Sequence, residues 1–230
     1  MHPSITMIDT VAHRLGPYAE QVVFLGGAVV PLLVTDQAAP PVRHTQDVDL
    51  VIEAASLSSY SQWDDHLRSL GFTHVPDVIC RWQVEGVLVD VMPQEERILG
   101  FANHWYAEAL RSAAATRLPT GLAVRVIAAP CFLATKLEAF RSRGGEDYHG
   151  SADLEDIVAV LDGRAALCEE TSQAAPDLRA YVAGELAKLL RHRDFVEALP
   201  GHLGSALAGG DRLALLLRTA QQIAGLARSP

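Results

Sequence analysis

The 230-residue sequence lacks a long uninterrupted hydrophobic run. Its longest apolar stretch, residues 22–34, is broken by Gly26, Gly27 and Pro31. It therefore falls short of the roughly 18 consecutive apolar residues that a membrane-spanning helix needs. The N-terminus also lacks the basic-then-apolar order of a secretory signal. We expect a protein that does not enter a membrane.

Cysteine is scarce as well, with only Cys80, Cys131 and Cys168 in the chain. Their odd number and wide spacing argue against a disulfide framework and against a zinc knuckle. A reducing cytoplasm is the compartment that this cysteine usage favours.

Basic residues are outnumbered, 19 lysines and arginines against 28 acidic residues, for a net charge of −9. This balance argues against a protein that coats nucleic acid through a broad basic surface. It leaves room for a local groove, because arginines recur from Arg81 to Arg125 and residues 188–193 are basic. Taken singly, each of these is better explained as part of an ordinary solvated face. The 49% hydrophobic composition supports a packed core of one sizeable domain or two small ones.

Two carboxylates, Asp47 and Asp49, stand one residue apart at the start of an apolar run over residues 45–52. We interpret the run as a strand, in which both carboxylates point to one face while Val48 and Leu50 point to the other. Hard oxygen ligands at this spacing suit Mg²⁺, which combines one or two carboxylates with substrate phosphates. The alternative is a solvated strand end or a helix cap, which needs no function.

Two further features support a metal and phosphate site. The apolar run before Gly26 and Gly27 ends at these glycines, which let a backbone approach phosphate oxygens closely. Asp90 interrupts another apolar run, residues 86–93, where a carboxylate is costly unless it has a charged partner. A metal ion held by Asp47 and Asp49 would be such a partner.

The order Gly-Gly, then Asp-x-Asp, then a third Asp on a later strand resembles the nucleotidyltransferase superfamily related to polymerase beta. Residues 43–50, Arg-His-Thr-Gln-Asp-Val-Asp-Leu, resemble the Arg-x-Thr-x-Asp-hydrophobic-Asp-Leu signature of the AbiEii/MenT-type toxin nucleotidyltransferases. Residues 129–140 and 152–157 resemble the later lysine and Asp-x-x-Asp motifs of the same toxins. The resemblance extends over residues 20–163.

This resemblance implies an enzyme that transfers a nucleoside monophosphate from an NTP to an acceptor hydroxyl and releases pyrophosphate. It implies Mg²⁺ or Mn²⁺ as cofactor, the 3′ end of tRNA as acceptor and a cognate antitoxin as partner, as in a toxin–antitoxin system. The expected residues are Asp47, Asp49, Asp90, Lys136 and Asp153 for catalysis, with Asp90 as general base; Asp47, Asp49 and Asp90 for the metal; and Gly26, Gly27, Arg43, Thr45 and Lys136 for the nucleotide.

Other functions stay open. The enzyme could act on a small molecule such as an aminoglycoside, or on a protein hydroxyl. The chain could also be a non-catalytic relative that binds a nucleotide or a partner protein, although three mutually repelling carboxylates argue against that reading. Asp153 and Asp156 also have a simpler explanation, since acidic residues in a first helical turn favour the helix dipole.

The patterning predicts an α+β fold with a mixed sheet flanked by helices and a helical C-terminal region. The resemblance implies that this is the polymerase beta-like nucleotidyltransferase fold, with a catalytic domain over residues 1–127 and a C-terminal region over residues 128–230 that completes the active-site cleft. A tight turn at Glu85 and Gly86 would make the strand of Asp90 antiparallel to its predecessor. We expect strands at 22–25, 45–52, 72–75, 78–84, 87–92, 114–118 and 122–127, helices at 5–15, 28–34, 56–70, 105–115, 130–143 and 151–163, and apolar helical stripes at 178–190 and 207–226.

Overall fold

The computed structural model describes residues 1–143, 146–204 and 210–228. The chain divides into two compact units. Unit 1 comprises Met1–Leu32 and His44–Ala128, and unit 2 comprises Leu33–Arg43 and the chain from Ala129 onward. The segment Leu33–Arg43, which the sequence-based division placed in the first domain, thus packs within unit 2.

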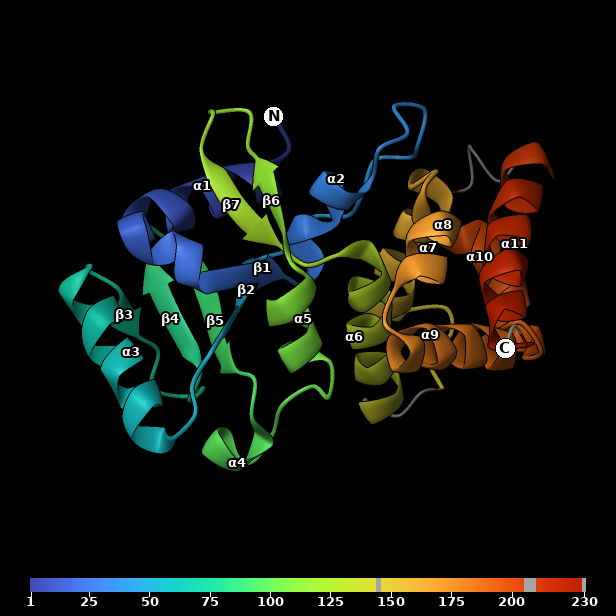
Figure 1. The fold of residues 1–230 in the computed structure, drawn as a ribbon. Helices are drawn as coiled ribbons and strands as arrows, with labels where there is room; N and C mark the ends of the chain where they lie inside the picture. The colour runs from blue at the N-terminus through green and yellow to red at the C-terminus, as the bar shows by residue number, and fades with distance from the viewer. Residues whose placement is uncertain (144–145, 205–209, 229–230) are drawn as a thin grey trace. The chain divides into compact units, whose positions relative to one another are not determined.

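Unit 1 is built on a mixed sheet, which the described residues form from seven strands in the order β3-β4-β5-β2-β1-β7-β6 (Figure 1). The pairs β2·β5 and β1·β7 are parallel, and the other neighbours are antiparallel. This confirms the expected α+β class with a mixed sheet. The strands are β1 (Val22–Leu25), β2 (Asp47–Ile52), β3 (Thr73–His74), β4 (Arg81–Val84), β5 (Val87–Pro93), β6 (Ala114–Arg117) and β7 (Ala123–Val126).

The hairpin between β4 and β5 turns where the sequence predicted it. Glu85 and Gly86 both have positive φ, 48° and 81°, as a two-residue turn of type I′ requires. The strand expected over residues 78–84 is shorter and begins only at Arg81, whose N–H bonds back to the Val78 carbonyl at 2.9 Å in a turn. The strand expected over residues 72–75 is likewise reduced to Thr73–His74; the Val75 N–H still donates to the Arg81 carbonyl at 2.9 Å, but the Arg81 N–H turns to Val78 instead of returning the bond.

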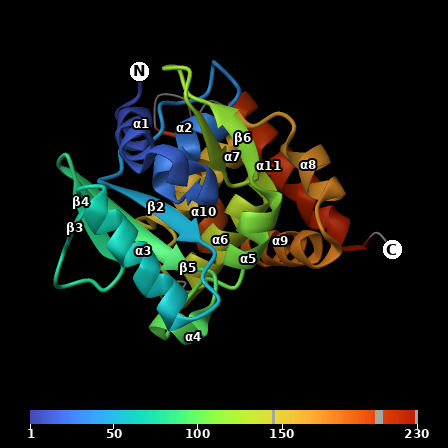
Figure 2. The ribbon, with the colours of Figure 1, turned by 60° about the vertical axis from the view of Figure 1, so that its left-hand side comes forward.

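Helices cover this sheet. The helix α1 packs against β2 and β5 and buries Ile8, Val11 and Leu15 at helical spacing, while α5 packs against β1 and β2. The helix α3 lies beside β3 (Figure 2) and is capped by Ser56, whose hydroxyl accepts the Ser59 N–H. The helical elements here are α1 (Pro3–Leu15), η1 (Gly16–Gln21), η2 (Gly27–Val29), α2 (Val30–Leu33), α3 (Leu57–Ser69), α4 (Glu96–Leu99) and α5 (Tyr106–Ser112).

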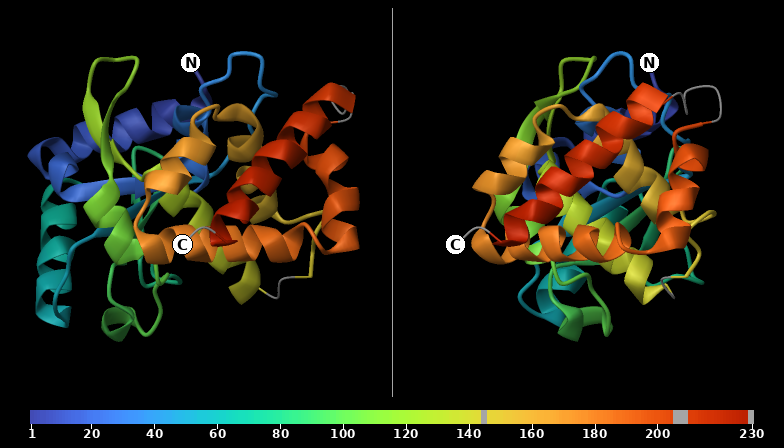
Figure 3. Two further views of the ribbon diagram at one scale, coloured as in Figure 1. Left: turned by 45° about the vertical axis from the view of Figure 1, so that its right-hand side comes forward. Right: turned by 90° about the vertical axis from the view of Figure 1, so that its right-hand side faces the viewer.

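Unit 2 is helical. The helix α6 packs against α7, α8 and α9, and α11 lies across α9 (Figure 3). Leu207, the first residue of the stripe predicted over 207–226, lies outside the described residues. The helices are α6 (Ala129–Ser142), α7 (Ala152–Gly163), α8 (Leu167–Gln173), α9 (Pro176–Leu189), α10 (Arg193–His202), α11 (Gly210–Gly225) and η3 (Leu226–Arg228).

The segment Leu33–Arg43 is tied to the helices of unit 2. The Thr35 and Asp36 amides donate to the carbonyl of Gly163 at the end of α7, at 2.8 and 2.9 Å. From α11, the Arg212 guanidinium contacts Asp162 at 2.7 Å and Asp36 at 3.0 Å. Arg212 therefore links the segment, α7 and α11.

None of the three cysteines forms a disulfide. In the stretches that the structure describes, every helix is too short or too polar to span a bilayer.

The first prediction concerns Arg212, whose partner Asp162 exposes only 1% of its side chain. Arg212→Ala should lower the free energy of unfolding at pH 7 by about 3–5 kcal/mol, because it leaves a buried carboxylate uncompensated. Burial already raises the pKa of Asp162 despite the lowering effect of Arg212, so the variant should raise this pKa further. A carboxyl group whose pKa is higher in the folded than in the unfolded protein binds a proton more tightly in the folded state. The free energy of unfolding therefore falls as the pH rises and this proton is lost.

The loss should accordingly be smaller near pH 4, the ordinary range of a carboxyl pKa, than at pH 8 when measured by urea unfolding. The matched control is Arg193→Ala, which removes an ion pair to Glu197 with side chains 85% and 53% exposed. It should cost no more than about 1 kcal/mol at either pH. Equal losses in both variants would show that Arg212 does not hold the segment.

Candidate active site

Two neighbouring strands bring the three predicted metal ligands to one face of the sheet. Asp47 and Asp49 are alternate residues of β2, and the parallel register of β2 and β5 sets Asp49 opposite Asp90. Neighbouring strands lie about 4.8 Å apart, and residues opposite each other point to the same face. The sequence predicted that the sheet would gather these carboxylates, and the register does so.

The other face of β2 is apolar and completely covered. Val48, Leu50 and Ile52 have no exposed surface. In contrast, the side chains of Asp47 and Asp90 are 30% and 15% exposed. The strand thus anchors its apolar face in the core and keeps the opposite face within reach of solvent. We call this opposite face, which carries Asp47, Asp49 and, from β5, Asp90, the acidic face.

Gly26, at the end of β1, lies directly against Asp49. Its backbone has φ 68° and ψ −163°, a region that only glycine enters readily. A Cβ built on Gly26 would lie 1.8 Å from Oδ2 of Asp49. The absence of a side chain at Gly26 therefore makes room for the carboxylate, whereas the predicted approach to phosphate by Gly26 and Gly27 stays a prediction.

Arg81 is a member of this face that sequence reasoning did not assign to the site. The antiparallel register of β4 and β5 sets Arg81 opposite Asp90. Its Nε and Nη2 donate to the two oxygens of Asp90 at 2.7 Å each, and Nη2 also lies 3.3 Å from Oδ2 of Asp47. The hydrogen bonds to Asp90, with the nearby charges of Asp90 and Asp47, raise the pKa of Arg81, so the guanidinium stays charged. The turn at residues 85–86 was the available signal, because a two-residue turn pairs position 81 with position 90.

Thr45 also lies on the acidic face. Its hydroxyl donates to Oδ1 of Asp47 at 2.9 Å. Asp47 is thus held by Thr45 on one oxygen and approached by Arg81 on the other.

The remaining predicted residues gather in unit 2. Lys136 of α6 contacts Asp153 at 3.1 Å and Asp156 at 2.7 Å, both from the first turns of α7. Arg143 pairs with Asp153 at 2.6 Å, and Arg43 forms a fork on Asp156 with Nε and Nη2 at 2.8 and 3.0 Å. The carboxylates of Asp153 and Asp156 are 4% and 1% exposed. Both aspartates are therefore buried members of an ion-pair network. A favourable interaction of exposed acidic residues with the helix dipole does not by itself explain their positions.

Each unit thus assembles one set of predicted residues. Unit 1 holds the three predicted metal ligands with the glycines and the threonine, and unit 2 holds the predicted lysine, arginine and fourth aspartate. The first set is Gly26, Gly27, Thr45, Asp47, Asp49 and Asp90, and the second is Arg43, Lys136 and Asp153.

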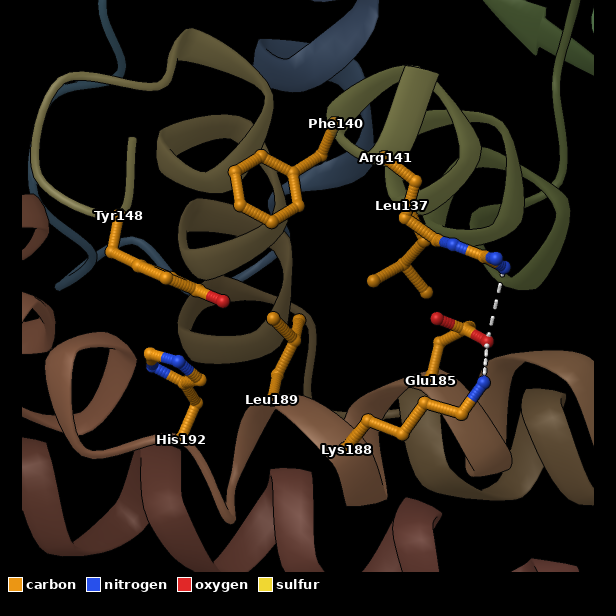
Figure 4. A pocket seen from close by; sticks show the side chains of 8 residues that line it. All are labelled: Leu137, Phe140, Arg141, Tyr148, Glu185, Lys188, Leu189 and His192. Atoms are coloured by element: carbon orange, nitrogen blue, oxygen red, sulfur yellow. Dashed lines mark hydrogen bonds and ion pairs between the residues drawn. The ribbon is translucent and has the colours of Figure 1, made fainter. Parts of the chain in front are cut away.

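Unit 2 also contains a cavity of about 260 Å³, to which none of the predicted residues contributes (Figure 4). The rings of Tyr148 and His192 stack at one side with centroids 4.3 Å apart. At the other side, Arg141 and Lys188 both reach Oε1 of Glu185, at 3.3 and 2.6 Å. The complete lining is Leu137, Phe140, Arg141, Tyr148, Glu185, Lys188, Leu189 and His192.

The donor atoms on the acidic face match a hard divalent cation in their chemistry, although they are not arranged around an ion in this structure. Asp47, Asp49 and Asp90 offer carboxylate oxygens only, which suit Mg²⁺ or Mn²⁺ and lack the nitrogen and sulfur atoms that zinc favours. Within the described part of the chain, no three His, Cys, Asp or Glu side chains are arranged to hold an ion. Arg81 donates to both oxygens of Asp90, so a metal that contacts Asp90 along the same edge of the carboxylate has to displace at least one of these hydrogen bonds.

No protein-family model and no curated protein matches this sequence. The function therefore has to be inferred from the residues of the site and from their geometry.

The second prediction tests the contact between Gly26 and Asp49. Gly26→Ala should destabilise the protein more than Gly16→Ala, by at least about 1 kcal/mol in urea unfolding, the cost of forced overpacking. Gly16 is the matched control, because its φ of 55° and ψ of −127° impose similar backbone strain while a Cβ there meets no atom within 4 Å. Equal losses in the two variants would mean that the position of the Asp49 carboxylate does not depend on Gly26.

Proposed function

We propose that this protein is a metal-dependent nucleotidyltransferase, which transfers a nucleoside monophosphate from an NTP to an acceptor hydroxyl. The observation that carries the proposal is the alignment of Asp49 with Asp90 across β2 and β5, with Asp47 on the same face. Three carboxylates on one partly exposed face supply the kind of oxygen donors that a divalent cation with a bound triphosphate prefers.

Each group on this face has a role in that reaction. Asp47, Asp49 and Asp90 would hold Mg²⁺ or Mn²⁺, which supplies positive charge to the triphosphate and lowers the pKa of the attacking hydroxyl. Asp90 accepts the proton of that hydroxyl on a carboxylate oxygen. The hydroxyl oxygen forms a bond to the α-phosphorus, the bond from this phosphorus to the pyrophosphate oxygen breaks, and pyrophosphate leaves. Thr45 keeps Asp47 oriented through its hydrogen bond.

The roles of the residues in unit 2 rest on the resemblance. Lys136 and Arg43 carry the positive charge that would contact triphosphate oxygens, and Asp153 holds the Lys136 ammonium at 3.1 Å. The ion pairs among these side chains are also expected if the residues only stabilise the fold. Kinetic measurements on variants are therefore needed to distinguish triphosphate binding from a purely structural role.

The acceptor is proposed from the same resemblance. The motifs over residues 43–50 and 129–157 favour the 3′ end of tRNA, and with it a toxin whose partner is an antitoxin. A small molecule or a protein hydroxyl would require the same carboxylates, so an assay has to include all three acceptor classes.

A second candidate is a non-catalytic relative that binds a nucleotide or a protein, and Arg81 is the observation that favours it. Repulsion among the three carboxylates argues against retaining them without a metal. Arg81 offsets part of this repulsion through its contacts with Asp90 and Asp47, so the three carboxylates can lie on one face without a bound metal.

The decisive assay incubates the protein with each labelled NTP and total tRNA in Mg²⁺ or Mn²⁺. We expect label at the RNA 3′ end from at least one NTP, and its loss when a chelator is in excess. Robust transfer in excess chelator would rule out the metal mechanism. Transfer to an added aminoglycoside or to protein, with none to RNA, would replace the proposed acceptor, and absence of transfer to every acceptor would favour the non-catalytic candidate.

The third prediction separates the acidic residues. Asp49→Ala should abolish transfer, because the carboxylate between Gly26 and Asp90 is lost. Asp90→Asn should leave NTP binding intact and lower kcat by a factor on the order of 10²–10⁴, the range for loss of a positioned base. Asp65→Asn is the control, since Asp65 is 82% exposed on α3 and should behave as wild type. Full activity of Asp49→Ala would overturn the assignment.

The fourth prediction concerns Lys136. Lys136→Ala leaves each buried carboxylate one arginine, Arg143 on Asp153 and Arg43 on Asp156, so the variant should fold, as thermal melts would check. A contact with the triphosphate in ground and transition states alike raises KM for NTP and spares kcat, whereas a contact strengthened in the transition state lowers kcat as well. Lys188→Ala, which removes the only other lysine, should match wild type. Wild-type kinetics in Lys136→Ala would reduce this lysine to a structural residue.

A further inference from the structure

The acidic face has a positive charge built into it. Arg81 reaches the face from β4, and its register partner Asp90 fixes the side chain beside β5 and β2. Like charges within a few ångströms repel one another, whereas a guanidinium between them attracts both. Arg81 donates to both oxygens of Asp90 and reaches Asp47, so it offsets part of this repulsion and holds the two side chains on the same side of the sheet.

We propose that Arg81 is the internal counter-ion of this site and competes with the divalent metal for Asp90. The inference rests on the proposed function, because it presupposes that Asp49 and Asp90 hold a metal. In the free protein the guanidinium binds Asp90; when the metal and NTP bind, the guanidinium releases at least one oxygen of Asp90. Arg81 is therefore a positioning residue for the carboxylates and sets the affinity of the metal.

The geometry of the fork makes the competition direct. Nε and Nη2 take one oxygen of Asp90 each, at 2.7 Å, so the carboxylate is occupied along its whole edge. The same Nη2 also reaches Asp47 at 3.3 Å. A metal ion that contacts Asp90 through the same edge displaces at least one of these bonds, and bidentate Arg–carboxylate pairs are among the stronger hydrogen-bonded pairs in proteins.

The side chain of Arg81 is able to make this exchange. It is 27% exposed, so the guanidinium can turn toward solvent without crossing the packed core behind the sheet. A bound triphosphate offers it new anionic oxygens, which arginine binds as readily as a carboxylate. NTP should therefore assist metal binding in the wild-type protein more than in a variant without Arg81.

The test measures Mn²⁺ binding to the full-length protein by electron paramagnetic resonance of the free ion, without NTP and with a non-hydrolysable NTP. Arg81→Met keeps the length of the stem and removes the charge. It should bind Mn²⁺ at least tenfold more tightly than wild type without NTP, and its affinity should respond less to NTP. Adding Asp49→Asn to Arg81→Met should remove the gain, which locates the ion at this face.

The matched control is Arg68→Met, which removes a positive charge from α3, where Arg68 and Asp65 form an exposed pair at 3.5 Å. Its Mn²⁺ affinity should stay within about twofold of wild type, since exposed charges are largely screened. An equal gain in Arg68→Met would attribute the effect to net charge and overturn the proposal. If Arg81→Met fails to fold, Arg81→Lys is measured instead; it keeps the charge but cannot form the fork, and should bind Mn²⁺ more tightly than wild type by at least about threefold.

Failure of this inference and failure of the proposed function give different results. If wild type binds Mn²⁺ in a way that Asp49→Asn abolishes, but Arg81→Met binds it equally or less tightly, Arg81 only supports the carboxylates and the function stands. If neither protein binds Mn²⁺, with or without NTP, both proposals are wrong.

Discussion

The acidic face depends on one alignment across three strands, in which Arg81, Asp90 and Asp49 lie side by side on β4, β5 and β2. The turn at residues 85–86 sets the first pairing, and the buried apolar residues of β2 and β5 set the second. A shift of either register by one residue would turn the charged side chains of one strand toward the core. The same hydrophobic pattern that stabilises the sheet therefore also positions the charged groups.

The sequence predicted those parts of the structure that follow from local patterns. Alternation of apolar and polar residues predicted β2 and the face of Asp47 and Asp49, and the turn signal at residues 85–86 predicted the antiparallel partner of β5. It did not reveal the fork of Arg81: the turn at residues 85–86 pairs position 81 with position 90, but pairing alone does not show whether an arginine side chain bonds to its neighbour or extends into solvent. It also did not reveal that Leu33–Arg43 packs within unit 2, because the contacts of Arg212 with Asp36 and Asp162 join positions that are far apart in the chain.

Both charged clusters show why a motif alone does not decide function. In unit 2, Asp153 and Asp156 are buried among Lys136, Arg43 and Arg143, and removal of one partner from such a network is costly whether or not the network binds a ligand. In unit 1, Asp47 and Asp90 keep partial exposure, which a purely structural ion pair does not need. This difference in access to solvent favours the acidic face as the location of the proposed reaction.

The central claim is that Asp49 and Asp90 share a divalent cation, and the most direct measurement is a crystal structure with Mn²⁺ and a non-hydrolysable NTP, with the ion identified by its anomalous scattering. The account predicts an anomalous peak within about 2.5 Å of an oxygen of both carboxylates, and an Arg81 guanidinium that has left at least one oxygen of Asp90. A nucleotide bound with no peak at this face, or with the Arg81 fork on Asp90 unchanged beside a metal held elsewhere, would contradict it.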